Sequence, residues 1–109
     1  MNLEEASTSF DSENVGPFLG RLKPLIESGF SDGEIIQVQR MMERLKIDEE
    51  KELEFPIRYH GRQTVLRVRI FMDDVDSPDL YFFTDPELAK EIDKAILDCV
   101  WEVASYQSR

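Results

Sequence analysis

The chain has 109 residues, of which 23 are acidic and 13 are basic, and its formal net charge is -10 at pH 7. This length suits one domain with a single hydrophobic core. Because so many carboxylates would repel a phosphate backbone, nucleic acid is not the expected partner. No apolar run approaches the roughly 20 residues that a membrane-spanning helix needs, so we expect no membrane partner and a cytoplasmic location.

One cysteine and one histidine limit the metal and redox chemistry of the chain. Cys99 cannot form an internal disulfide, and together with His60 it is too few ligands for a zinc site. Cys99 also falls within an apolar helical pattern, where a thiol is shielded, so we interpret it as a packing residue and not as a nucleophile. The sequence therefore predicts no metal and no cofactor.

Residues 1–16 are rich in Ser, Glu, Asp and Asn and carry few large apolar side chains. Such a segment buries too little surface to offset the entropy of ordering it, so we expect a flexible acidic tail. From Pro17 onward apolar residues recur at helical spacing, although Pro24 should interrupt the helix because it lacks an amide hydrogen. The predicted folded domain therefore spans residues 17–109.

A second helix is predicted to begin at Ser31. Ser31 and Glu34 have the Ser-x-x-Glu spacing of a capping box, in which each side chain bonds the backbone amide at the other end. The apolar positions that follow have helical period: Ile35, Val38, Met42 and Leu45. The two N-terminal helices are expected to form a helical hairpin.

Two arms of alternating character between Lys51 and Met72 predict a β-hairpin. Their apolar positions share one face: Leu53, Phe55, Ile57, Tyr59, Leu66, Val68, Ile70 and Met72. A two-residue turn at His60-Gly61 keeps these positions together, and it leaves Pro56, which has no amide hydrogen, facing away from the neighbouring strand. The first arm is therefore predicted to be an edge strand.

This register also predicts which charges meet on the outer face of the hairpin. Glu54 should lie opposite Arg67, and Glu52 should lie opposite Arg69. Opposite charges in directly facing positions stabilise a strand pair. Arg58 is expected on the same face.

Residues 80–84 predict a third, strongly apolar strand that pairs with the second arm, and Pro86 and Glu87 suit the first turn of a long C-terminal helix. The element order is then α-α-β-β-β-α. We interpret it as an α+β fold, a two-layer sandwich in which a three-stranded antiparallel meander sheet packs on helices.

The third strand has apolar side chains on both faces. Leu80 and Phe82 point one way, whereas Tyr81 and Phe83 point the other way, so one pair is expected on the outer face near Phe71. The N-terminal helices, a second copy of the chain or another protein would have to cover that pair. The residues predicted to bind a partner are Arg58, Arg67, Arg69, Phe71, Tyr81, Phe83 and Trp101.

Catalysis has little support in the sequence. Histidine is a common general base, but the sequence places no Ser, Cys or Asp beside His60, and histidine suits the left-handed conformation of this turn. The aspartates between Asp73 and Asp79 lack the central Gly and terminal Glu of a known calcium loop, so a solvated turn is favoured. No catalytic residue is predicted, and an enzyme using His60 is the third hypothesis.

Two patterns suggest nucleic-acid binding, but each has a simpler interpretation. The outer arginines with Tyr81 or Phe83 resemble a sheet that binds single-stranded RNA, but neighbouring glutamates are expected to neutralise them. The second helix carries Arg40, Arg44 and Lys46, as a DNA-reading helix would. Its acidic neighbours make a solvated face the better interpretation.

The leftover apolar surface favours a non-enzymatic protein-interaction module, such as a small adaptor, chaperone or regulatory subunit. It would hold another protein or a second copy of itself through the outer sheet face or the edge strand. The alternative hypothesis is an acidic mimic of nucleic acid that inhibits a nucleic-acid-binding protein. The basic residues mixed among the acids weaken this alternative.

Overall fold

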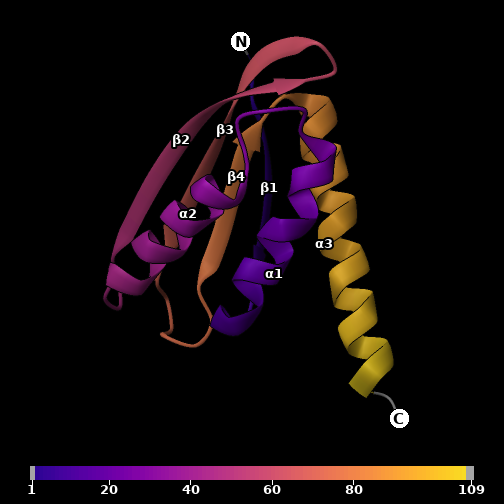
Figure 1. The fold of residues 1–109 in the computed structure, drawn as a ribbon. Coiled ribbons are helices and arrows are strands. Elements are labelled where there is room, and N and C mark those ends of the chain that lie inside the picture. Colours follow the sequence, from indigo (N-terminus) through magenta and orange to yellow (C-terminus); the bar gives the residue numbers. More distant parts are fainter. Residues whose placement is uncertain (1, 108–109) are drawn as a thin grey trace.

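The computed structural model describes residues 2–107, with side chains described as far as Cys99. The chain forms two layers, an antiparallel sheet and a layer of helices on one of its faces (Figure 1). The strands are β1 (Glu4–Ser9), β2 (Glu50–Tyr59), β3 (Arg62–Phe71) and β4 (Asp79–Thr84), in the order β1-β4-β3-β2. The helices are α1 (Ser12–Leu22), the short 3-10 helix η1 (Lys23–Leu25), α2 (Asp32–Arg44) and α3 (Pro86–Gln107). The predicted α+β class is confirmed.

The hairpin of β2 and β3 has the predicted register. Glu54 pairs with Arg67 and Glu52 pairs with Arg69, and the turn is at His60-Gly61. Both turn residues have positive φ, 49° at His60 and 74° at Gly61, as a two-residue turn of this hand requires. Because β4 pairs with β3, β2 lies at an edge of the sheet, as predicted.

The prediction of a flexible tail over residues 1–16 is wrong. Glu4–Ser9 forms β1, which pairs with β4 along its whole length, and α1 begins at Ser12 with Pro17 inside it. The sheet therefore has four strands in the described chain where the sequence predicted three. Composition misled us because β1 is held by backbone pairing, and its one buried side chain is the small Ala6, opposite Phe82.

The N-terminus of α2 has the predicted capping box. The Ser31 backbone N–H and the Ser31 hydroxyl both donate to the Glu34 carboxylate at 2.7 Å. These hydrogen bonds to the charged form lower the pKa of Glu34. The helix that begins here places its buried positions Ile35, Val38 and Met41 toward the sheet.

A single core lies between the two layers. Alternate residues of the sheet face it, and α1, α2 and α3 cover that same face (Figure 1). The inward row of β4 is Leu80, Phe82 and Thr84, whereas Tyr81 and Phe83 face outward. No helix within residues 2–107 is long and apolar enough to cross a membrane.

Candidate interaction surfaces

The outer face of the sheet is the side that none of the described helices covers. The cross-strand registers place Arg67 between Glu54 and Phe83, in one row across β2, β3 and β4. The next row places Arg69 between Glu52 and Tyr81. The face therefore carries an acidic strand, a basic strand and an aromatic strand side by side.

The arginines of this outer face are fully paired. Arg67 Nε lies 2.9 Å from a Glu54 carboxylate oxygen, and this hydrogen bond raises the pKa of Arg67. Arg69 lies 3.0 Å from Glu50 and 3.1 Å from Glu52. The sequence correctly predicted that glutamates would neutralise these two arginines. Their charges are therefore already satisfied before any partner arrives.

Three aromatic side chains extend the outer face beyond the ion pairs. Tyr81 and Phe83 are half-buried and point outward, and Phe71 is half-buried beside them at the end of β3. The guanidinium of Arg69 lies over the Phe83 ring, 5.0 Å from its centroid. The N-terminal helices do not cover this stripe, because their buried residues belong to the core on the opposite face.

The structure separates Arg58 from the other predicted partner-binding residues. Arg58 lies near the turn, opposite Gln63, and its side chain is 3.7 Å from Glu27. Its backbone N–H donates to the Ser28 carbonyl at 3.0 Å, and its carbonyl accepts from the Glu27 N–H at 2.9 Å. The Trp101 side chain, also predicted to bind a partner, lies outside the described residues.

The structure does not bring together the candidate residues for catalysis and metal binding. His60 is exposed in the hairpin turn, and its ring centroid lies 4.2 Å from the ring centroid of Tyr59. In the aspartate loop, the Asp74 carboxylate accepts the Asp76 N–H at 3.0 Å, which is a turn interaction. Among the described side chains, no group of His, Cys, Asp and Glu is arranged to hold a metal ion.

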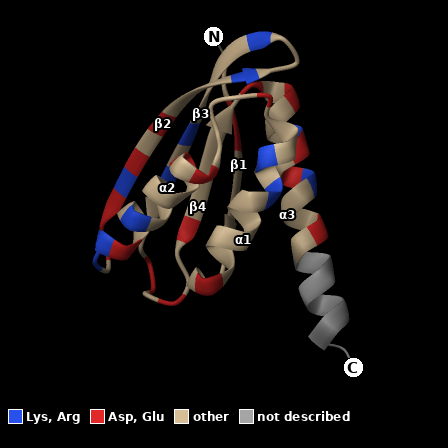
Figure 2. Ribbon diagram, viewed as in Figure 1, with Lys and Arg blue, Asp and Glu red and all other residues tan. Residues whose placement is uncertain are grey.

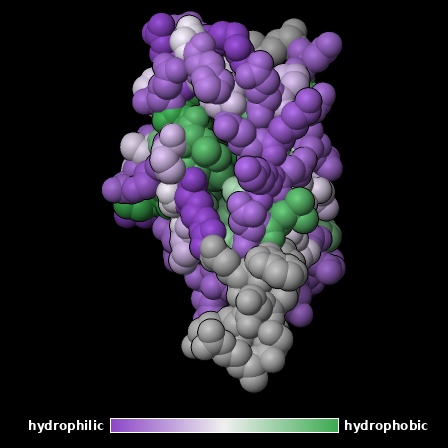
Figure 3. All heavy atoms as spheres, turned by 90° about the vertical axis from the view of Figure 1, so that its right-hand side faces the viewer, coloured by the Kyte–Doolittle hydropathy of each residue, from purple (hydrophilic) through white to green (hydrophobic). Residues whose placement is uncertain are grey.

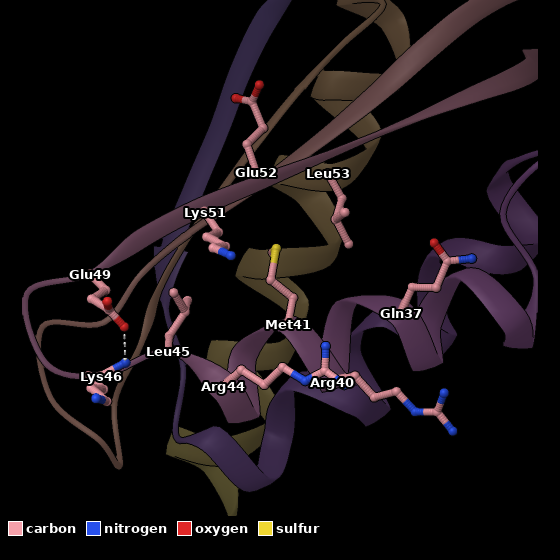
Figure 4. A pocket seen from close by; sticks show the side chains of 10 residues that line it. All are labelled: Gln37, Arg40, Met41, Arg44, Leu45, Lys46, Glu49, Lys51, Glu52 and Leu53. Atoms are coloured by element: carbon pink, nitrogen blue, oxygen red, sulfur yellow. Dashed lines mark hydrogen bonds between the residues drawn. The ribbon is translucent and has the colours of Figure 1, made fainter.

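A groove of about 710 Å³ separates α2 from the beginning of β2 (Figure 4). Lys51 and Leu53 point from β2 toward Met41 on α2 (Figure 4), so the groove has an apolar contact between Leu53 and Met41 with the Lys51 cation beside it. Arg40 and Arg44 lie one helical turn apart on α2. The lining residues are Gln37, Arg40, Met41, Arg44, Leu45, Lys46, Glu49, Lys51, Glu52 and Leu53.

The cations of this groove differ from those of the outer face. No ion pair within the described part of the chain reaches Arg40, Arg44, Lys46 or Lys51. The two carboxylates nearby are already engaged. One of them, on Glu49, accepts the Lys46 backbone N–H at 2.7 Å. The other, on Glu52, points to the outer face, where Arg69 holds it (Figure 4).

The sequence pattern placed three of these cations together but did not predict the groove. It grouped Arg40, Arg44 and Lys46 on one helix and gave no role to Lys51. One feature of the sequence could have indicated its role. Lys51 is two residues from Leu53 on β2, so both side chains point to the face that the helices cover. That α2 lies across this end of β2 is a tertiary relationship that the sequence pattern does not contain.

Large exposed apolar side chains elsewhere on the described surface are scattered. Ile36, Ile47, Val75 and Leu97 come from four different elements or loops. The side of the molecule that presents α3 is mostly hydrophilic, with separate hydrophobic patches (Figure 3). Single residues of this kind are normal on protein surfaces, so they do not compete with the outer face as a docking site.

The architecture defines the class of this protein as an α+β two-layer sandwich with helices on one face of its sheet. Comparisons with protein-family models, with curated proteins and with solved structures find no match to this chain.

Proposed function

We propose that this protein is a non-enzymatic protein-interaction module that binds another protein, or a second copy of itself, through the outer face of its sheet. One observation carries this proposal. The helices of the described chain pack on the other face, and the aromatic stripe of Phe71, Tyr81 and Phe83 stays half-exposed at the surface.

The composition of the outer face supports a protein partner. Aromatic residues and arginine are enriched at the centres of protein interfaces, where they contribute most of the binding energy. Here Arg69 is held between two glutamates and the Phe83 ring, so its side chain is ordered in advance and loses little entropy on binding.

The alternative functions have less support. A mimic of nucleic acid needs an unbroken acidic surface, whereas the outer face carries Arg67 and Arg69, whose side-chain nitrogens lie 2.9–3.1 Å from their glutamate partners. An enzyme that uses His60 would need a partner group beside the ring, and the hairpin turn supplies none among the described hydrogen bonds and ion pairs. A cytoplasmic location remains a prediction from the sequence.

The test is the double substitution Tyr81→Ser with Phe83→Ser. Because both side chains face outward, the variant should fold, and we expect self-association or partner capture to weaken at least about tenfold, as for loss of an interface hot spot. Sedimentation velocity and pull-down measure the effect. Val75→Ser is the matched control, since it removes an apolar side chain that is 60% exposed and lies beside Ser12 and Met42 of the helices. Unchanged behaviour of the double variant in both assays would contradict the proposal.

A further inference from the structure

The groove between α2 and β2 concentrates positive charge in an acidic protein. Four cationic residues line it: Arg40, Arg44, Lys46 and Lys51. Figure 2 shows basic segments of α2 and β2 at this end of the molecule, with acidic segments between them along β2. The formal net charge of the whole chain is -10, so a positive groove is opposite in sign to the rest. A ligand that carries negative charge is therefore attracted to this groove and repelled by most other surfaces.

The backbone groups along the outer edge of β2 are free to pair near the groove, at the open end, and are already hydrogen-bonded or missing near the hairpin turn, at the closed end. At the closed end, Arg58 bonds Ser28 and Glu27 through its backbone, and Pro56 has no amide hydrogen. Alternate residues of an edge strand direct their backbone groups away from the sheet. Even-numbered residues of β2, such as Arg58, direct these groups outward, and at the open end they are Glu52 and Glu54. Neither residue has a backbone hydrogen bond outside the sheet among the described residues.

We propose that the groove binds an acidic segment of another protein in extended conformation, which pairs with the β2 edge as an added strand. Backbone groups of Glu52 and Glu54 would supply the pairing, and the groove would select the side chains. Successive side chains of a strand point to opposite faces, so the bound segment needs acidic residues at alternate positions, facing Arg44 and Lys51. The intervening residues face the glutamates of the outer face and should be neutral or basic.

A second copy of the chain is a poor occupant of this edge. Pairing β2 with another β2 would bring two rows of glutamates, Glu50, Glu52 and Glu54 from each copy, onto the same face. Like charges in facing positions destabilise a strand pair. The charge of the groove and the charge of the strand edge therefore both favour a different chain. This surface is separate from the aromatic stripe, so either proposal can fail without the other.

The first experiment measures how tightly the protein binds a fluorescent peptide of alternating Glu and Thr residues. Reversing two charges of the groove with Arg40→Glu and Arg44→Glu should weaken binding about tenfold or more. The matched control is Lys90→Glu with Lys94→Glu, which changes the net charge equally on exposed positions of α3. Equal affinity of the groove variant and this control variant would overturn the proposal.

The second experiment tests strand pairing with two substitutions at one position. Glu52→Thr keeps the backbone N–H, whereas Glu52→Pro removes it at a position that faces away from β3, as Pro56 already does. We expect the Thr variant to bind the peptide and the Pro variant to lose at least about tenfold in affinity relative to it. Equal affinities would overturn the added-strand geometry. If the Pro variant does not fold by circular dichroism, the charge-reversal pair still decides the proposal.

Two further probes separate this ligand from other anions. A peptide with the same Glu and Thr composition in two blocks should bind more weakly, because its acidic residues do not alternate. Single-stranded oligothymidylate should not displace the alternating peptide, because glutamates flank the edge strand and repel a phosphate backbone. Displacement by the oligonucleotide, or equal binding of the block peptide, would overturn the proposal.

Discussion

The outer sheet face and the groove beside it differ in whether their cationic side chains form ion pairs. On the outer face, strand pairing sets Arg67 and Arg69 opposite glutamates, and each arginine is held within 3.1 Å of a carboxylate. In the groove, Arg40 and Arg44 come from a helix that has no such register with the strand. A sheet can therefore satisfy its own charges, whereas a junction between a helix and a strand edge leaves them available to a ligand.

The largest expected effect tests the division between the two faces of the sheet. Phe82→Ala should lower the free energy of unfolding by about 3–5 kcal/mol, because Phe82 is fully buried under the helices. Phe83→Ala should cost much less, since Phe83 is only half-buried and faces outward. Chemical denaturation of both variants measures the difference. Equal losses would show that the two faces are buried alike.

The next effect concerns the closed end of the β2 edge. Gly29 has a φ of 95°, and a Cβ atom there would lie 2.2 Å from the Pro56 carbonyl oxygen. Gly29→Ala should therefore destabilise the protein by at least about 1–2 kcal/mol, the cost of the left-handed conformation alone. The matched control is Gly20→Ala on α1. A Cβ atom there would meet nothing within 4 Å, so this variant should be as stable as the wild type or more stable. Thermal denaturation compares them, and equal midpoints would contradict this description of the edge.

A third effect sharpens the contrast between charge and apolar contact. Peptide binding in the groove should weaken as salt is raised, because exposed charges are screened beyond about 8 Å at physiological ionic strength. Binding through the aromatic stripe should change less, since apolar burial is not screened. Titrations at low and high salt measure both. Peptide affinity for the groove that does not change with salt would contradict its assignment as an anion-binding surface.

The smallest effect concerns the anchoring of α2, which carries the groove arginines. Hydrogen bonds from Ser31 lower the folded-state pKa of Glu34 below its ordinary value of 4.5. The stability that this provides is present above pH 4.5 and is lost as the pH falls through the lower folded-state pKa. Ser31→Ala should return the Glu34 pKa toward its ordinary value. An NMR titration of the Glu34 carboxyl measures it, and an unchanged pKa would argue against the capping box.

The sequence predicted the sheet best where its residue pattern was strict. Alternation, together with the missing amide hydrogen of Pro56, was sufficient to predict the register of β2 and β3. The β1 strand escaped prediction because its sequence is polar and only Ala6 is buried. The groove escaped because its lining depends on how α2 lies across β2. Periodicity describes each element separately, so it cannot predict surfaces that two elements make together.

The division between the two surfaces is tested most directly by an NMR titration of the protein with the alternating Glu and Thr peptide. The account predicts backbone amide shifts that concentrate at residues 50–54 of β2 and along α2, with Tyr81 and Phe83 unaffected. Shifts centred on Tyr81 and Phe83, with none along the β2 edge, would contradict it.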